Sequence, residues 1–435
     1  MDSVATLTMK RVYRLFGIVS MTLALVWAAR ASAEVPAQGP DLRDEDSLVR
    51  FALTHNPDLH AARWQQDIAS AGVTQASALS NPVARGEWLH VQTPSEYGWG
   101  VGLEWAPPQP GVFGAGKDAA RARVRAVRAD LSERAADLEA AVRLHFAQVA
   151  AREEEIALAE QSIATRRSVH QAVQERVAHG AASRIDLSLA AVSLARGEQE
   201  RDLLVLERAS DVSQLETLAG VPAERSLDAS VRPKQSLAAT PSPTPSSENL
   251  ERRALAERPQ LKADAARSDA AEAMLAAERA KRWPWLALQA RYRHRDQLSN
   301  PDDVTLGVQL TLPIFDRNPG PIAAAVATRN EVSDVARAHR FNIEREVLAL
   351  KRESERRREL AEHYDRTIAP VLSEHAALVK QALAGAELDL TALLAAEDLV
   401  TKGGIEYLEA RLAQRKAEIA LARALGNYGR AVGSQ

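Results

Sequence analysis

The nine residues Tyr97-Gly-Trp-Gly-Val-Gly-Leu-Glu-Trp105 set large apolar side chains against three glycines and a glutamate at every second position. Such alternation predicts a β-strand with one apolar face, because successive side chains of a strand point to opposite sides. Val304-Thr-Leu-Gly-Val-Gln-Leu-Thr-Leu312 repeats the pattern 207 positions later. Each stretch is close to the ~10 residues that a tilted transmembrane strand needs.

Both strands have a candidate partner, so each predicts a β-hairpin. In the second hairpin, about 285–313, one face carries Leu286, Leu288, Ala290 and Tyr292. Residues 83–91 alternate poorly, and we predict the first hairpin, about 83–105, mainly because the second one exists. A charge at Val101 or Val308 on the apolar face is expected to do more harm than one at Gly100 or Thr305.

The rest of the chain is duplicated as well. Pro259 stands 202 positions after Pro57 in a similar Pro-x-Leu-x-Ala context, and Gly426 stands 206 positions after Gly220. Leu388-Asp389-Leu390 matches Ile185-Asp186-Leu187. This self-similarity predicts two copies of one unit of roughly 200 residues.

The domain boundaries follow from composition. A basic start, the apolar run 15–29 and Ala31-Ser32-Ala33 are typical of a signal peptide, and the run is short of the ~20 residues of a membrane anchor. Five prolines between Pro222 and Ser247 indicate a semi-extended linker. We predict a signal peptide (1–33), a first repeat (34–221), a Pro/Ser-rich linker (222–247), a second repeat (248–426) and a C-terminal tail (427–435).

Each repeat is expected to hold three helices. The first covers about 57–80 or 259–281, with Pro in the first turn. A very long helix pair follows the hairpin, at about 117–219 with a turn at Gly180, and at about 321–425 with a break at Gly385. Pro370 should kink the second long helix. A seven-and-four spacing predicts a buried seam, formed by Leu131, Leu138, Val142, Val149, Ile156 and Ile163.

Composition excludes several functions. The formal net charge is −3, with 55 basic and 58 acidic residues, so no basic excess exists to bind nucleic acid. There is no cysteine, hence no disulfide framework and no thiolate metal site. We find no catalytic or phosphate-binding motif and expect neither an enzyme nor a cofactor. His90 and His294 near the strand ends are possible metal-binding side chains, although exposed loop histidines are usually only solvated.

Five of the seven tryptophans lie in or beside the hairpins. Aromatic girdles at the two interfaces of a membrane barrel have this distribution, and the expected members are Trp88, Trp99, Trp105, Trp285 and Tyr292. A small soluble sheet packed on helices is the alternative interpretation. Four strands cannot close a barrel, and an open edge cannot face lipid, so several copies would have to share one barrel.

The order of these features resembles the TolC family of outer-membrane efflux ducts over almost the whole mature chain. The resemblance rests on the duplicated order, on the residue–proline pairs at 56–57 and 258–259, and on Gly180-Ala-Ala-Ser-Arg-Ile-Asp-Leu187 at the helix turn. Residues 312–322, Leu-Pro-Ile-Phe-Asp-Arg-Asn-Pro-Gly-Pro-Ile, look like the strand-to-helix corner of the heavy-metal (Czc-like) branch.

The resemblance implies a mainly α fold with a small β part, assembled as a homotrimer with a 12-stranded barrel in outer-membrane lipid and an α-helical tunnel across the periplasm. It implies a periplasmic adaptor and an inner-membrane resistance-nodulation-division pump as partners. The adaptor would meet the helix tips at Val177, Gly180, Ser183, Arg184, Gly385 and Glu387. Many relatives carry a lipidated cysteine that this chain lacks, and its second tip is two residues shorter than the first.

The entrance and the cargo leave alternatives open. Asp186 and Asp389 each follow a helix break, so each could cap its helix or, repeated by threefold symmetry, form an acidic ring; we expect Asp389 in the ring and Asp186 as the cap. Divalent metal cations are the first choice of cargo, through the branch resemblance. Organic compounds remain the second choice, and a periplasmic coiled-coil scaffold is a third function.

Overall fold

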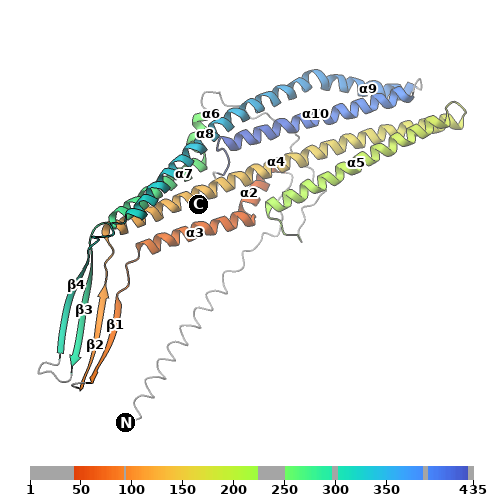
Figure 1. Ribbon diagram of the computed structural model, residues 1–435. Helices are drawn as coiled ribbons and strands as arrows, with labels where there is room; N and C mark the ends of the chain where they lie inside the picture. The colour runs from red at the N-terminus through yellow and green to blue at the C-terminus, as the bar shows by residue number, and fades with distance from the viewer. Residues whose placement is uncertain (1–43, 93–94, 224–249, 296–301, 386–389, 430–435) are drawn as a thin grey trace, which may run out of the picture. The chain divides into compact units, whose positions relative to one another are not determined.

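The two halves of the chain have the same order of elements: a short helix, a helix of 21 or 22 residues, a β-hairpin, a very long helix and a returning helix (Figure 1). The computed structural model describes residues 44–92, 95–223, 250–295, 302–385 and 390–429. The predicted signal peptide and nearly all of the predicted linker lie outside these ranges.

The first half consists of α2 (Glu45–His55), α3 (Pro57–Ser77), β1 (Val83–Gln92), β2 (Ser95–Trp105), α4 (Pro110–Ala178) and α5 (Arg184–Ala219). The second consists of α6 (Leu250–Glu257), α7 (Pro259–Ala280), β3 (Trp285–Arg295), β4 (Asp302–Thr311), α8 (Pro319–His363), the π-helix η3 (Tyr364–Ile368), α9 (Ala369–Gly385) and α10 (Leu390–Ala424). The duplicated, mainly helical fold with two hairpins is confirmed.

Several boundaries differ from the prediction. The sequence does not predict the short helices α2 and α6, because each ends just before a longer helix whose start is marked by proline. Asn56, which precedes Pro57, has an extended ψ of 125°, and this separates α2 from α3. Helix α4 begins at Pro110 rather than near residue 117, since proline fits the first turn of a helix. Helix α3 ends three residues early, at Ser77.

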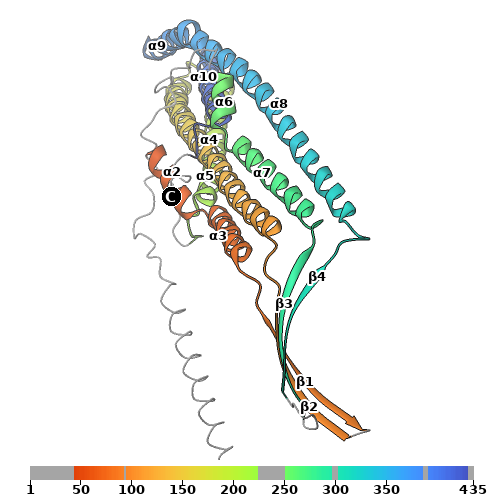
Figure 2. The same cartoon turned by 90° about the vertical axis from the view of Figure 1, so that its left-hand side faces the viewer.

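The four strands form one antiparallel sheet in the order β1-β2-β3-β4, so β2 and β3 join the two repeats. In this joint Val101 lies opposite Tyr292, and Trp99 lies opposite His294. Figure 2 shows the strands leaving the same end of α3, α4, α7 and α8. Strands β1 and β4 are the two edges, each with a strand on one side only.

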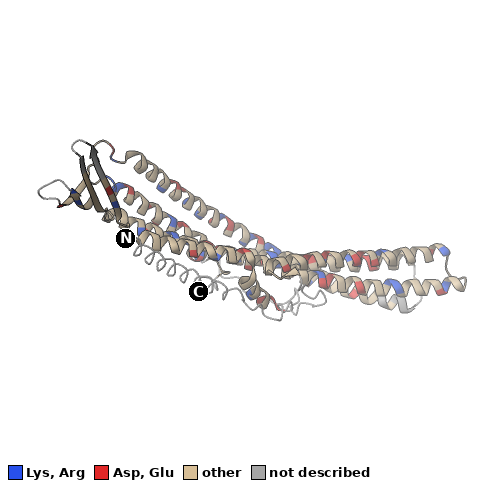
Figure 3. Cartoon of the chain, turned by 90° about the horizontal axis from the view of Figure 1, so that it is seen from below, with Lys and Arg blue, Asp and Glu red and all other residues tan. Residues whose placement is uncertain are grey.

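Helix α4 is the central packing element, in contact with α2, α3, α5, α7 and α10. Its predicted seam is buried: Leu138 is partly buried, and the other five members are at most 8% exposed. Charged residues of both signs are spread along the helices (Figure 3). The long helices are therefore joined by a narrow line of apolar contacts between charged flanks.

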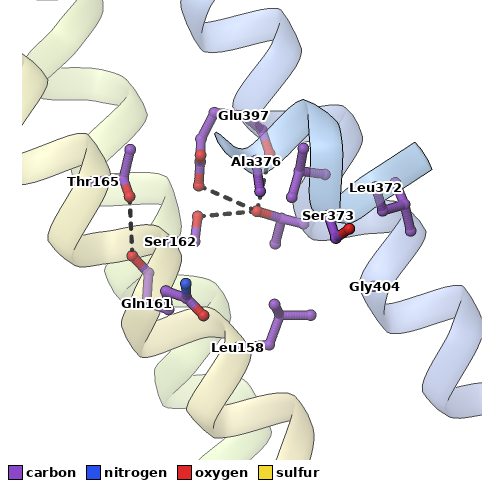
Figure 4. Close-up of a pocket in the computed structure, with 11 residues that line it drawn as sticks. Leu158, Gln161, Ser162, Thr165, Leu372, Ser373, Ala376, Glu397 and Gly404 are labelled. Atoms are coloured by element: carbon purple, nitrogen blue, oxygen red, sulfur yellow. Dashed lines mark hydrogen bonds between the residues drawn. The ribbon is translucent and has the colours of Figure 1, made fainter. Parts of the chain in front are cut away.

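A buried polar cluster ties α4 to α10 (Figure 4). The Thr401 hydroxyl lies 3.1 Å from the Ser162 hydroxyl and 3.0 Å from the backbone oxygen of Glu397. Beside it, a Cβ added to Gly404 would lie 2.5 Å from a methyl carbon of Leu158. A side chain at position 404 would have to displace this methyl group, so the glycine favours the close approach of the two helices.

Pro370 disturbs its helix as predicted. The π-helix η3 ends at Ile368, two residues before this proline, whose missing N–H removes one helical hydrogen bond. The guanidinium of Arg411 in α10 donates to both carboxylate oxygens of Asp365 at 2.9 and 2.7 Å. This ion pair attaches the widened turn to the returning helix.

Gly220 packs closely against the backbone at the corner between α2 and α3. The Asn56 side chain accepts the N–H of Leu59 at 2.9 Å and donates to the backbone oxygen of Leu218 at 2.9 Å. Gly220 has a φ of +71°, and a Cβ there would lie 2.6 Å from the backbone oxygen of His55. This glycine therefore serves both the helix end and the close contact.

Gly220→Ala should consequently destabilise the protein more than Gly180→Ala. Gly180 has a similar φ of +74° but nothing within 4 Å of its added Cβ, so its substitution should cost only the left-handed backbone penalty of about 1 kcal/mol. Thermal unfolding of the purified variants, followed by helical circular dichroism, measures the difference. Equal shifts of Tm would show that the corner contact contributes nothing.

Candidate membrane and entrance sites

The two faces of the sheet differ in chemistry. On one face the large side chains of β2, β3 and β4 are exposed, with exposed fractions of 52% at Val101, 80% at Leu306 and 67% at Val308. The register places Val101 beside Tyr292, and Leu306 beside Ala290. An apolar face of this kind on three neighbouring strands needs a cover, either lipid or protein.

Aromatic residues lie at two levels of this apolar face. Trp88 is directly opposite Trp99, and the rings of Trp99 and Tyr292 are 5.4 Å apart. Trp105 lies six residues from Trp99 along β2, or ~20 Å at the usual rise of a strand. Membrane barrels have an apolar band ~25 Å tall between their girdles, so this spacing is compatible with a girdle role, which stays a prediction.

Trp285 differs from the other four aromatic residues. It pairs with Thr311, and the neighbouring pair Leu286–Leu310 occupies the apolar face, so Trp285 points to the opposite side. Its indole N–H donates to the backbone oxygen of Pro107 at 2.6 Å, and that of Trp105 donates to Ser80 at 2.9 Å. Both indoles thus hold the strand ends to the segments that connect the strands with the helices.

The opposite face carries ion pairs across the strands. Arg85 pairs with Glu104 at 2.8 Å, and Arg293 with Asp303 at 3.2 Å. Arg291 of β3 reaches Glu87 of β1 at 3.4 Å, across the intervening strand β2. The alternation of residues 285–293 puts Arg291 and Arg293 opposite the apolar side chains, but it does not predict their acidic partners.

The glycines of β2 make room for these arginine side chains. A Cβ on Gly100 would lie 2.9 Å from Cγ of Arg293 and 3.1 Å from the backbone oxygen of Tyr292. Gly100 is therefore a crowded position, and the expectation that Asp does less harm there than at Val101 stays a prediction, although any side chain at Gly100 would have to displace Arg293. Alternation alone could not reveal this, because the obstacle comes from β3.

His294 lies on the apolar face with a carboxylate neighbour. Its Nδ1 is 2.8 Å from an oxygen of Asp302, and the Tyr292 hydroxyl donates to the same oxygen at 2.6 Å. His90 lies in β1, but its side chain is outside the described part. Within the described residues, no group of three or more His, Asp or Glu side chains could hold a metal ion.

The first helix tip is an ordered turn. At the end of α4, the N–H of Gly180 donates to Val177 at 3.1 Å and that of Ala181 donates to Arg176 at 2.8 Å, the pattern of a Schellman motif. The Ser183 hydroxyl then accepts the N–H of Ile185 at 2.9 Å.

Asp186 completes this turn as a helix cap. Its carboxylate accepts the backbone N–H of Ser183 at 3.0 Å, which makes the reciprocal capping box that the sequence suggested. Arg184 and Ser183 are exposed, whereas Val177 packs partly buried beside Val169 and Val173. The first tip thus presents polar side chains on a fixed backbone.

The second tip is described only up to the last residue of α9, Gly385, and again from Leu390. Glu387 and Asp389 lie outside the described residues, so the acidic ring stays a prediction. None of the helices in the described ranges combines the length and the apolar character needed to cross a bilayer.

Comparison with known proteins identifies the class. The model of the family "Outer membrane efflux protein" matches residues 48–221 and 250–427, which correspond to the two repeats. The chain therefore belongs to the outer membrane efflux protein family, and it is an outer-membrane efflux duct.

Individual relatives agree with this assignment. The chain is 27% identical over 326 residues to the cobalt-zinc-cadmium resistance protein CzcC of Cupriavidus metallidurans, covering 75% of this chain and 76% of CzcC. A membrane protein of Pseudomonas aeruginosa superposes with a TM-score of 0.72 at 21% identity, covering 91% and 98% of the two chains. CusC superposes with a TM-score of 0.71 at 17% identity, covering 90% and 95%.

The two faces can be tested with one pair of substitutions in β4. Val308→Asp should impair membrane assembly, because a charge on the lipid side of a barrel costs up to about 2–4 kcal/mol and somewhat less for an acid. Thr305→Asp, on the polar face of the same strand, should be tolerated. Recovery of heat-modifiable oligomer from outer-membrane fractions measures assembly, and equal losses would overturn the assignment of the faces.

Proposed function

We propose that three copies of the chain share one 12-stranded barrel and form the exit duct of a tripartite efflux system. The observation that carries this proposal is the four-stranded sheet with edges at β1 and β4. Backbone N–H and C=O groups of an open edge find no partner in hydrocarbon, so the edges must pair between copies. Twelve strands lie within the range of outer-membrane barrels.

The proposed cargo is divalent heavy-metal cations. The support is the similarity to CzcC, whose name states cobalt, zinc and cadmium resistance, together with the corner sequence at residues 312–322. The duct would conduct passively from an inner-membrane resistance-nodulation-division pump through a periplasmic adaptor at the helix tips. Export of organic compounds by the same route is the second candidate.

At the entrance we propose that Asp389 forms an acidic ring around the threefold axis. The support is indirect: the Asp186 carboxylate is engaged in its capping box, which leaves the corresponding residue of the other repeat as the candidate for the ring. Three carboxylates at a narrow opening would attract cations and weakly repel one another.

Assembly and cargo can be tested together. The mature protein in detergent should have the mass of a trimer by light scattering, and a stable monomer would contradict the shared barrel.

In cells that hold the cognate pump and adaptor but lack the duct, expression of this protein should restore growth in zinc, cobalt or cadmium. Val308→Asp is the matched control, and restored tolerance to organic dyes without metal tolerance would favour the second candidate.

The entrance is tested by comparing the two aspartates in reconstituted trimers. Asp389→Ala should lower cation selectivity and weaken block by divalent ions without a change in Tm. Asp186→Ala should instead lower stability by about 1 kcal/mol through loss of the cap and leave conductance unchanged. The reverse assignment of the two effects would refute the acidic ring at Asp389.

A further inference from the structure

A pocket of about 510 Å³ lies at the strand-to-helix corner of the second repeat. It is bounded by the end of α7, the segment leading into β3 and the segment that follows β4. Its cationic lining residues are Arg279, Arg282 and Arg317, and its apolar ones include Trp283, Leu312 and Ile314. The volume is within the range of small-ligand sites.

The three arginines have no acidic partner within the described residues, where no ion pair involves any of them. The nearby acids are engaged elsewhere. Glu278 binds Lys281 at 2.6 Å and the Asn318 amide at 2.7 Å, and these two contacts lower the pKa of its carboxyl. Asp316 accepts the backbone N–H of Asn318 at 2.8 Å. A backbone N–H does not neutralise Asp316, but three arginines and no acid line the pocket, so the lining has an excess of positive charge.

The rim of the pocket is apolar and exposed. Trp283 is 73% exposed, Ile314 62%, and the neighbouring Phe315 is fully exposed. In the single chain, apolar side chains of this size lie exposed beside cations that have no acidic partner there, and together they match an amphipathic ligand with an anionic head and an apolar body.

The place of the pocket indicates the source of that ligand. Its residues directly precede Trp285, the first residue of β3, and directly follow Thr311, the last residue of β4. If these strands cross the outer membrane, the pocket lies where they leave the bilayer on the side of the helices. Interfacial arginine and tryptophan residues are the usual contacts of lipid headgroups.

We propose that this pocket binds the phosphodiester headgroup of an anionic phospholipid in the periplasmic leaflet, and this rests on the proposed membrane barrel. Arg279, Arg282 and Arg317 supply forked donors for the phosphate oxygens. The acyl chains lie along Leu312, Ile314 and Phe315. The lipid fixes the height of the barrel in the membrane.

The first repeat lacks this chemistry. Ser77, Ser80 and Asn81 stand 202 positions before Arg279, Arg282 and Trp283. Cations at the end of α7 also compensate the helix dipole, but that effect does not account for Arg317, which follows β4. The site therefore belongs to the second repeat alone, once per chain.

The experiment titrates the purified full-length assembly with dioctanoyl phosphatidylglycerol and counts bound lipid by native mass spectrometry. Replacing Arg279, Arg282 and Arg317 together by Gln should weaken binding about a hundredfold, since each interfacial cation contributes roughly a factor of five. The control replaces Arg196, Arg352 and Arg356, three exposed arginines on the long helices, and should leave binding unchanged. Equal binding by both triple variants would overturn the proposal.

Two further arms identify the ligand. Inorganic phosphate should fail to displace the lipid, and Ile314→Ser with Phe315→Ser should weaken lipid binding although all three arginines remain. Displacement by phosphate at the concentration of the lipid would overturn the lipid assignment in favour of a free-anion site. The mass and the ion conductance of the same preparations show whether the trimeric duct has formed. If a variant still forms a conducting trimer but binds no lipid, the loss is due to the pocket and not to failed assembly.

Discussion

The unpaired backbone of β1 and β4 is the constraint on which the rest of the molecule depends. Inside a bilayer each unpaired N–H or C=O costs several kcal/mol, so the sheet must be continued by another copy. The order of strands allows this continuation with the same kind of strand pairing that already exists within the chain. The inner joint pairs the second strand of the first repeat with the first strand of the second repeat. A joint between copies would pair β4 with β1, again a second strand with a first strand.

The helices can also form the same kind of contact within a chain and between copies, because the two repeats have corresponding helix contacts. Gly220 closes the first repeat against the α2–α3 corner, and Gly426 closes the second against Glu257 at the α6–α7 corner, each with a positive φ. The corner residues themselves have diverged. Asn56 caps α3 through its own side chain, whereas the buried Arg258 pairs with Glu346 and Glu133 from two other helices. The geometry was kept while the polar chemistry that satisfies it changed.

Much of this fold follows from the sequence, since alternation, proline spacing and self-similarity are local or periodic signals. The hairpins, the long helices, the buried seam and the capping box at Ser183 and Asp186 all belong to this class. Apart from the short helices α2 and α6, the features that the sequence did not predict depend on neighbours across strands. The Glu87–Arg291 pair spans β2, and the crowding at Gly100 comes from Arg293. Only the register brings these residues together, and alternation within one strand does not give its register against a neighbouring strand.

The two repeats differ in the continuity, and therefore the stiffness, of their long helices. Helix α4 runs unbroken for 69 residues, whereas the corresponding helix of the second repeat is interrupted by a π-helix before Pro370. A π-turn and a missing N–H weaken the hydrogen-bond ladder at that point. The returning helix α10 carries Gly403 and Gly404 against Leu372 and Leu158, and the Arg411–Asp365 pair joins the two helices near this level. In a ring that alternates the two repeats, bending of the tunnel would therefore concentrate in the second repeat, while α4 and α5 keep their length and register.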